Sequence, residues 1–127
     1  MSADWYDKQG KPISDYNLIE LKLRDPNYKV VGDDYLGNDL QRYRVSTVWL
    51  GLDHNYSGGD PIIFETMVFE DKLVHAKVPA IPKYGLEGLE YKFHPSMDNF
   101  TRRYHTLAEA EAGHKEVVAE VKERMKR

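Results

Sequence analysis

Apolar and polar residues alternate along two stretches near the middle of the chain. Residues 41–52 and residues 62–69 are both rich in β-branched and aromatic side chains. Between them, residues 55–60 read Asn-Tyr-Ser-Gly-Gly-Asp, which are residue types typical of turns. The pattern therefore predicts a long antiparallel β-hairpin in the centre of the fold.

The chain leading to this hairpin is more polar. Residues 1–13 contain Gly10 and Pro12 and show no periodic apolar pattern, so we expect an irregular N-terminal arm. Residues 28–32 read Tyr-Lys-Val-Val-Gly and predict a strand, which the turn residues of 33–38 would end.

A short helix is predicted over residues 14–24. Ser14 is the expected N-cap, and Pro26 would stop the helix. The apolar alternation of Leu21 and Leu23 also fits a strand, so both assignments stay open here.

The C-terminal part predicts a long helix over residues 106–125. Thr106 and Glu109 have the spacing of a capping box, in which each side chain bonds the other residue's backbone N–H. Gly113 is unfavourable inside a helix, and close approach of the helix to the sheet would explain it. Apolar residues and one histidine recur at three- and four-residue steps along one face: Leu107, Ala110, His114, Val117, Val118, Val121 and Met125.

Residues 71–100 are interrupted by helix- and strand-breaking residues, namely Pro79, Pro82, Gly85 and Gly88. Short strands fit residues 71–78 and 89–94, but the segment as a whole predicts a loop-rich insertion. Such an insertion either carries contacts to a partner or is merely tolerated by the fold.

Together these elements predict an α+β fold. We expect an antiparallel sheet of roughly three to five strands, built on the central hairpin, with the long C-terminal helix packed on one face. The chain has 127 residues, which predicts a single domain over residues 1–127.

Composition and charge narrow the function classes. The chain has no cysteine and a net charge of −3, with Lys and Arg spread among Asp and Glu. This balance argues against strong nucleic-acid binding, which depends on clustered cations. No apolar run is long enough to span a membrane, and the N-terminus lacks a signal-peptide pattern, so a soluble protein of the cytoplasm is expected.

Three motifs carry a family resemblance. The sequences VSTVWLGLDH (45–54), PIIFETMVF (61–69) and TLAEAEAGH (106–114) resemble an uncharacterised family of small proteins encoded by tailed bacteriophages and prophages. The resemblance implies a phage origin, the host cytoplasm as the place of action and a shared fold, but it implies no reaction. Small phage proteins of this class often bind a host or defence component, which makes such a protein the leading expected partner.

The first candidate site combines acidic and histidine side chains near the hairpin. Asp53 and His54 sit beside the turn, Glu65 lies within an apolar strand, and His114 lies on the apolar helix stripe. Such groups can coordinate a divalent metal or form an acid–base pair. No spacing matches a known metal motif, however, so no metal, cofactor or catalytic residue is assigned.

Structural roles explain the same residues better than a shared site does. A histidine on an apolar helix face is usually buried and hydrogen-bonded, and Glu65 can accept hydrogen bonds or face outward from the sheet. Asp53 and His54 fit ordinary turn chemistry.

The second candidate site is a small cationic and aromatic cluster. Arg102, Arg103 and Tyr104 come just before the N-terminus of the helix that begins near Thr106. Together with that helix end they could bind an anion such as a nucleotide phosphate. Alternatively, both arginines are solvated and Tyr104 packs in the core.

Three functions follow from these alternatives. The leading prediction is a non-catalytic phage accessory protein that binds and inhibits a host or defence component. The second is sequestration of an anionic nucleotide signal, and the third is a small metal-dependent hydrolase or nuclease. A homo-oligomer is also expected, because a second subunit would cover any apolar sheet face that the helix leaves open.

Overall fold

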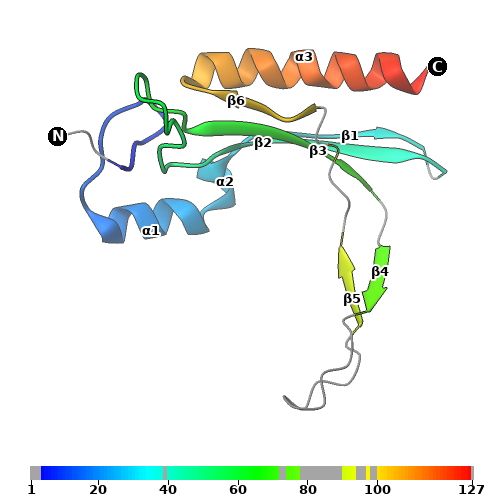
Figure 1. Cartoon of the computed structure of the whole chain (residues 1–127), viewed down its shortest axis with the longest axis horizontal. Helices are drawn as coiled ribbons and strands as arrows, with labels where there is room; N and C mark the ends of the chain where they lie inside the picture. The colour runs from blue at the N-terminus through cyan, green and yellow to red at the C-terminus, as the bar shows by residue number, and fades with distance from the viewer. Residues whose placement is uncertain are drawn as a thin grey trace.

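The computed structural model describes residues 4–38, 40–71, 74–77, 90–93, 97 and 100–126. Its main element is a sheet of four antiparallel strands in the order β1-β2-β3-β6. The strands are β1 (Val30–Gly37), β2 (Arg42–Trp49), β3 (Phe64–Glu70) and β6 (Arg102–Tyr104). A long helix, α3 (Leu107–Met125), lies along one face of this sheet (Figure 1). The α+β fold expected from the sequence is therefore confirmed.

The strand alternation predicted for the hairpin decides which side chains meet α3. From Val45 on in β2 and up to Val68 in β3, every second residue is fully buried on the helix side, namely Val45, Thr47, Trp49, Phe64, Thr66 and Val68. The helix meets them with the stripe predicted from its periodicity, of which Ala110, His114, Val117 and Val121 are buried. The core thus lies mainly between the sheet and α3, with polar side chains at its centre, and at one end Leu23 and Tyr28 from the segment before β1 also pack against it.

The N-terminal arm is attached to this core. Trp49 donates its indole N–H to the backbone oxygen of Tyr6 at 2.9 Å, and Tyr6 is itself buried. An isolated bridge joins Trp5 to Leu52. The arm is irregular, as its composition predicts, but its backbone and aromatic side chains close one end of the core.

The helical segment before β1 differs in detail from the prediction. The first helix, α1 (Tyr16–Arg24), is capped by Asp15 and not by Ser14, because the Asp15 carboxylate accepts from the backbone N–H of Asn17 at 2.9 Å. The helical assignment is confirmed over the strand alternative.

A second correction concerns residues 28–32. A short helix, α2 (Pro26–Lys29), occupies the beginning of the predicted strand. Asp25 caps this turn and proline suits a first helical position, so the local Asp-Pro signal prevails over the apolar pattern. The strand β1 consequently starts at Val30 and runs through the predicted turn to Gly37.

A small second sheet extends from the main one (Figure 1). It pairs β4 (Val74–Lys77) with β5 (Glu90–Phe93) in antiparallel register. Both strands fall in the stretches where the sequence allows them, while the rest of the predicted 71–100 insertion lies largely outside the described residues.

The start of α3 has the predicted capping box. The Thr106 hydroxyl accepts from the Glu109 N–H at 3.1 Å, and the Glu109 carboxylate accepts from the Thr106 N–H at 3.2 Å. Gly113 also has the predicted close approach: a Cβ built there would lie 2.2 Å from the Tyr104 ring on β6. The helix can therefore lie on the sheet only because residue 113 has no side chain.

This close approach makes Gly113→Ala destabilising. In an unhindered helix interior, alanine is better than glycine by about 1 kcal/mol. Here the displaced Tyr104 ring should reverse that sign, with a net loss of about 1–3 kcal/mol in unfolding free energy, measured by urea denaturation. The matched variant Ala112→Gly, on the exposed side of the helix, should lower the unfolding free energy only by the difference in helix propensity between alanine and glycine. A Gly113→Ala protein that is more stable than the wild type would contradict this packing.

Candidate functional site

A chain of polar side chains crosses the interface between α3 and the sheet. His114 of α3 lies with its Nε2 2.6 Å from Asp34 Oδ2 on β1 and its Nδ1 2.7 Å from Thr47 Oγ1 on β2. Thr47 Oγ1 lies 2.5 Å from Thr66 Oγ1 on β3, which in turn lies 3.0 Å from the Tyr104 hydroxyl on β6. We call these five residues the polar chain. It links all four strands of the main sheet to the helix.

The state of the His114 ring sets the direction of the polar chain. When the imidazole is neutral and faces an ionised Asp34 carboxylate, which can only accept, His114 donates from Nε2 and accepts at Nδ1. The Thr47 hydroxyl then donates to His114 and accepts from Thr66. The Tyr104 hydroxyl donates to Thr66. Every group is satisfied in this arrangement, and no described buried side-chain nitrogen or oxygen lacks a partner.

Backbone geometry leaves room for the imidazole. A Cβ at Gly32 of β1 would lie 2.6 Å from the His114 ring, so glycine allows the ring to rest directly on the strand. The strand register brings the threonines under the same ring, because Gly32 pairs with Thr47 and Thr47 pairs with Thr66 on the same face of the sheet.

The polar chain contains the groups of a catalytic triad in the same order, but a substrate has no access to its hydroxyl. Carboxylate, imidazole and hydroxyl follow one another as in a serine hydrolase. However, Thr47 has an exposed fraction of 0%, and its oxygen lies against Thr66 beneath the helix. A substrate cannot approach this hydroxyl without separation of the helix from the sheet, so the polar chain fits a structural role.

Tyr104 on β6 is the last residue of the polar chain. Burial raises the pKa of its phenol above the usual value, against an opposing effect of the Thr66 hydrogen bond. The phenol therefore keeps its proton more firmly in the folded protein than in the unfolded chain.

The first candidate site is divided by the sheet. His114 belongs to the helix side, whereas Glu65 points to the opposite face and forms an ion pair with Arg103 at 2.8 Å. Asp53 accepts from the backbone N–H groups of Asn55 at 2.7 Å and of Ile62 at 3.0 Å, which closes the hairpin turn. His54 places its ring edge-on against Tyr56 in the same turn.

These positions do not converge on one metal ion. Among the described residues, no three His, Asp or Glu side chains come close enough to share one. His114, for its part, is the buried, hydrogen-bonded side chain that its place on the apolar stripe suggested.

The second candidate cluster diverges as well. Arg102 points to the helix side and pairs with Glu120 at 3.3 Å, whereas Arg103 points to the opposite face. Tyr104 is engaged in the polar chain. The N-terminus of α3 is occupied by its own capping box, whose Glu109 carboxylate would repel an incoming anion.

The sheet face opposite α3 is a surface to which no role has yet been assigned. Only α1 and α2 lie on that side of the main sheet among the described helices, near one end of it (Figure 1). We call this surface the open face. The described side chains that alternate onto it are Asp33, Tyr35, Arg42, Arg44, Ser46, Val48, Glu65, Met67, Phe69, Asp71 and Arg103.

Tyr35 is the most prominent aromatic group of the open face. Its side chain is 49% exposed, and the guanidinium groups of Arg42 and Arg44 lie 4.6 and 5.7 Å from its ring centroid. Together with Phe69 and Asp71, Tyr35 and Arg44 line a hollow of about 160 Å³.

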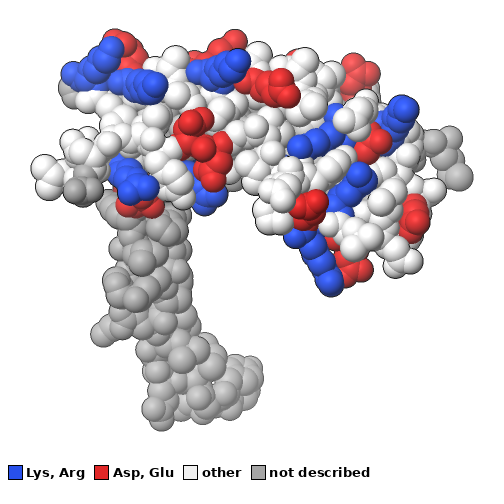
Figure 2. Space-filling view, turned by 180° about the vertical axis from the view of Figure 1, so that it is seen from behind, with Lys and Arg blue, Asp and Glu red and all other residues white. Residues whose placement is uncertain are grey.

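The cations of the open face are neutralised by neighbouring carboxylates. Arg44 pairs with Asp33 at 2.8 Å, and this hydrogen-bonded pair raises the pKa of the guanidinium. Arg42 pairs with Asp71 at 2.9 Å. Figure 2 shows the same mixing on the side of the molecule that it displays, where blue and red side chains are interspersed. The open face is thus polar and aromatic without a strong net charge.

Comparison of the chain with protein-family models, with curated proteins and with solved structures gave no match. Among the described residues, none of the helices is both long and apolar enough to cross a lipid bilayer.

Sequence reasoning missed most of the polar chain. It identified His114 and Tyr104 but not their partners Asp34, Thr47 and Thr66 as a group. One signal was present: threonines at the centre of an alternating buried face need partners, and a histidine on the opposing helix stripe can supply one.

Thr47→Val tests the structural role of the polar chain. Valine has nearly the same shape but leaves His114 Nδ1 without a partner and removes one of the two partners of the Thr66 hydroxyl. We expect a loss of about 1–3 kcal/mol in unfolding free energy, measured by denaturant titration. Ser46→Ala, the neighbouring position on the open face, should change stability by less than about 0.5 kcal/mol. Equal stability of Thr47→Val and the wild type would refute the assigned hydrogen bonds.

Measuring the unfolding free energy over a range of pH tests the role of Tyr104, the last residue of the polar chain. Because the pKa of this phenol is raised on folding, its stabilising effect is fully present below the ordinary tyrosine pKa of about 10. The effect is lost as pH rises through the folded value. The stability advantage of the wild type over Tyr104→Phe should therefore shrink above about pH 10. An advantage that grows at high pH would contradict this.

Proposed function

We propose that this chain is a non-catalytic binding protein whose open face contacts a protein partner. The observation that carries the proposal is the half-exposed Tyr35, which has two arginine guanidinium groups near its ring and lines a hollow together with Phe69. Tyrosine and arginine are enriched among the residues that dominate the energy of protein–protein interfaces.

The charge of the open face favours a protein over a nucleic acid or nucleotide. Arg42, Arg44 and Arg103 each have a carboxylate partner within the same face. A polyanion would have to displace these carboxylates, whereas a protein surface with apolar and mixed polar groups can pack on the paired side chains as they are. The sequestration of a nucleotide signal therefore has less support than protein binding.

The family resemblance supports the choice of partner. The motifs at 45–54, 61–69 and 106–114 resemble phage and prophage proteins, so we propose a host or defence component as the bound protein and its inhibition as the outcome. The hairpin motifs supply β2 and β3, which form the centre of the open face.

Site-specific crosslinking in bacterial cells tests this proposal. A photoreactive amino acid at position 35 should yield one defined adduct with a different protein, identified by mass spectrometry. The same amino acid at position 56, another exposed tyrosine but one in the hairpin turn, should not give that adduct. Adding Phe69→Asp to the position-35 protein should abolish the adduct, because a buried carboxylate is costly at an interface.

Three outcomes contradict the proposal. The first is the same set of adducts from positions 35 and 56, and the second is an adduct that persists with Phe69→Asp. The third is an adduct only between two copies of this chain. That result, supported by light scattering, would assign the open face to a homodimer.

A further inference from the structure

The strand β1 forms one outer edge of the main sheet, because the strand order is β1-β2-β3-β6. It has eight residues, whereas β6 at the other edge has three. Natural sheets usually shorten or cover their edge strands, since a long free edge is a template for another strand. Among the described residues, the backbone of residues 32–37 pairs with β2 alone. The outer side of β1 is therefore open to an added strand.

The strand register shows which backbone groups of β1 point outward. In an antiparallel pair, hydrogen-bonded residue pairs alternate with pairs that are not bonded. The N–H of Asn38, the residue after β1, donates to the Gln41 oxygen at 2.9 Å, so these two residues form a bonded pair. Counting back in steps of two, the β1 residues that bond β2 are Gly32, Asp34 and Leu36. The backbone groups of Asp33 and Tyr35 therefore point away from β2.

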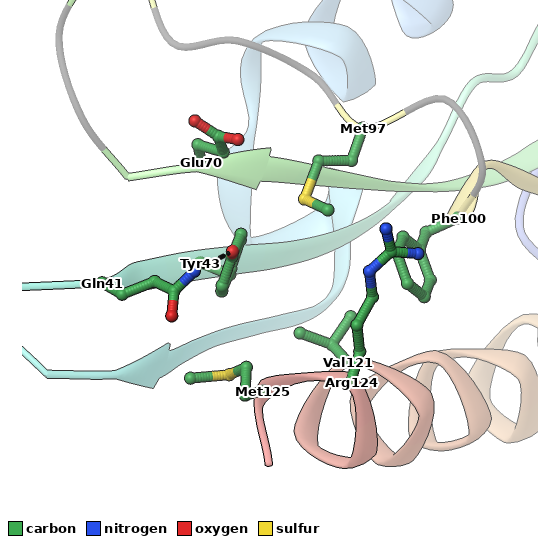
Figure 3. A pocket seen from close by; sticks show the side chains of 8 residues that line it. All are labelled: Gln41, Tyr43, Glu70, Met97, Phe100, Val121, Arg124 and Met125. Atoms are coloured by element: carbon green, nitrogen blue, oxygen red, sulfur yellow. Dashed lines mark hydrogen bonds between the residues drawn. The ribbon is translucent and has the colours of Figure 1, made fainter. Parts of the chain in front are cut away.

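The helix α3 holds β1 at two glycines. A Cβ at Gly32 would lie 2.6 Å from the His114 ring, and a Cβ at Gly37 would lie 2.9 Å from Met125 Cε. Met125 is the last residue of α3 and lies at the end of the sheet (Figure 3). A strand that is already fixed in place loses less conformational entropy when a second strand pairs with it.

The strand carries negative charge without any cation of its own. Val30–Gly37 contains Asp33 and Asp34 but no Lys, Arg or His. Arg44 binds both carboxylate oxygens of Asp33, at 2.8 and 2.9 Å. The Asp34 side chain is 53% exposed, and among the described residues only its Oδ2 has a partner, His114. Oδ1 of Asp34 is therefore available to a cation on an added strand.

We infer that β1 accepts an extended segment of the protein partner as an antiparallel fifth strand of the main sheet. The segment exchanges backbone hydrogen bonds with Asp33 and Tyr35 and places a Lys or Arg opposite Asp34. That position belongs to a non-hydrogen-bonded pair, in which side chains lie closest. The residue opposite Tyr35 lies on the open face, where an aromatic or β-branched side chain packs beside the tyrosine ring. The inference rests on the proposed function, because it assigns the edge next to the open face to the same partner.

A segment of another protein suits this edge better than a second copy of the chain does. Symmetric antiparallel pairing centred on Asp33 or on Asp34 would place that carboxylate opposite its own copy. Like charges directly opposite each other destabilise a strand pair. The two aspartates therefore disfavour self-pairing and favour a strand that carries a cation.

An NMR titration with a short peptide tests the inference. The probe is acetyl-Thr-Thr-Tyr-Lys-Val-Thr-Thr-amide, whose central Tyr, Lys and Val would lie opposite Tyr35, Asp34 and Asp33. In the free protein, the backbone amide protons of Asp33 and Tyr35 should exchange with solvent faster than those of Asp34 and Leu36. Saturation with the peptide should slow the exchange of Asp33 and Tyr35, because both amides then donate to the added strand.

Two altered peptides separate charge from backbone pairing. Glu in place of Lys should weaken binding by about fivefold or more, because a repulsive charge pair replaces an attractive one. Methylation of the Tyr backbone nitrogen removes a donor that the pairing needs and should abolish binding.

Protein variants locate the site on β1. Asp34→Asn should remove most of the preference for the Lys peptide over the Glu peptide. The matched variant Asp60→Asn, at an exposed position of the hairpin turn, should keep that preference. Tyr35→Pro removes an outward N–H without removing a bond to β2 and should abolish binding, whereas Tyr35→Thr, which keeps that N–H, should still bind. Thermal melting of each variant confirms that the fold is intact.

Three results would overturn the inference: no binding of the Lys peptide, equal affinity for the Lys and Glu peptides, or binding that leaves the exchange of Asp33 and Tyr35 unchanged. Slow exchange of both amides in the free protein would show that the edge is already covered, and light scattering would then identify a second copy as the cover. The two proposals fail separately. A peptide that does not bind refutes the edge site alone, whereas peptide binding without a cellular adduct from position 35 refutes the proposed partner alone.

Discussion

The polar chain is the constraint on which the rest of this structure depends. It places hydrogen-bonding groups at the centre of an otherwise apolar interface. There, one buried polar group without a partner destabilises the fold more than one hydrogen bond stabilises it. The helix must therefore sit at the one rotation and height at which His114 reaches both Asp34 and Thr47. Gly32 and Gly113 permit that position, because a Cβ at either would collide with a ring of the interface. Hydrophobic burial alone would hold α3 on the sheet without fixing its register so narrowly.

Because α3 packs on one face of the main sheet, the opposite face carries a different set of residue types. The sheet has a single long helix, so the residues that alternate away from it cannot be part of the same core. The chain places paired charges and aromatic rings there, such as the Arg44–Asp33 pair and Tyr35, in place of a second apolar layer. A surface of this kind is stable in water and still offers rigid anchors to another protein. The division into a packed face and an open face underlies the proposed function.

Local sequence signals predicted the elements well, and long-range contacts explain what they missed. The central hairpin and the capped C-terminal helix follow from alternation and helical periodicity, both of which are local. The contact between His114 and Asp34 joins residues 80 positions apart, and nothing in either segment alone indicates it. Glu65 shows the same limit, since its position in an apolar strand did not reveal whether it faces the helix or Arg103. The helical turn at Pro26 was missed for the opposite reason, because a strong local Asp-Pro signal overrode an apolar pattern.

The protonation pattern of His114 tests the central claim most directly. Long-range ¹⁵N–¹H NMR correlation of the imidazole at neutral pH reports which ring nitrogen carries the proton. In a neutral His114 ring, the polar chain requires the hydrogen on Nε2, facing Asp34, and an unprotonated Nδ1 that accepts from Thr47. A ring with its hydrogen on Nδ1, or one averaging between tautomers as in a solvated histidine, would contradict the one-directional chain and the account of the fold built on it.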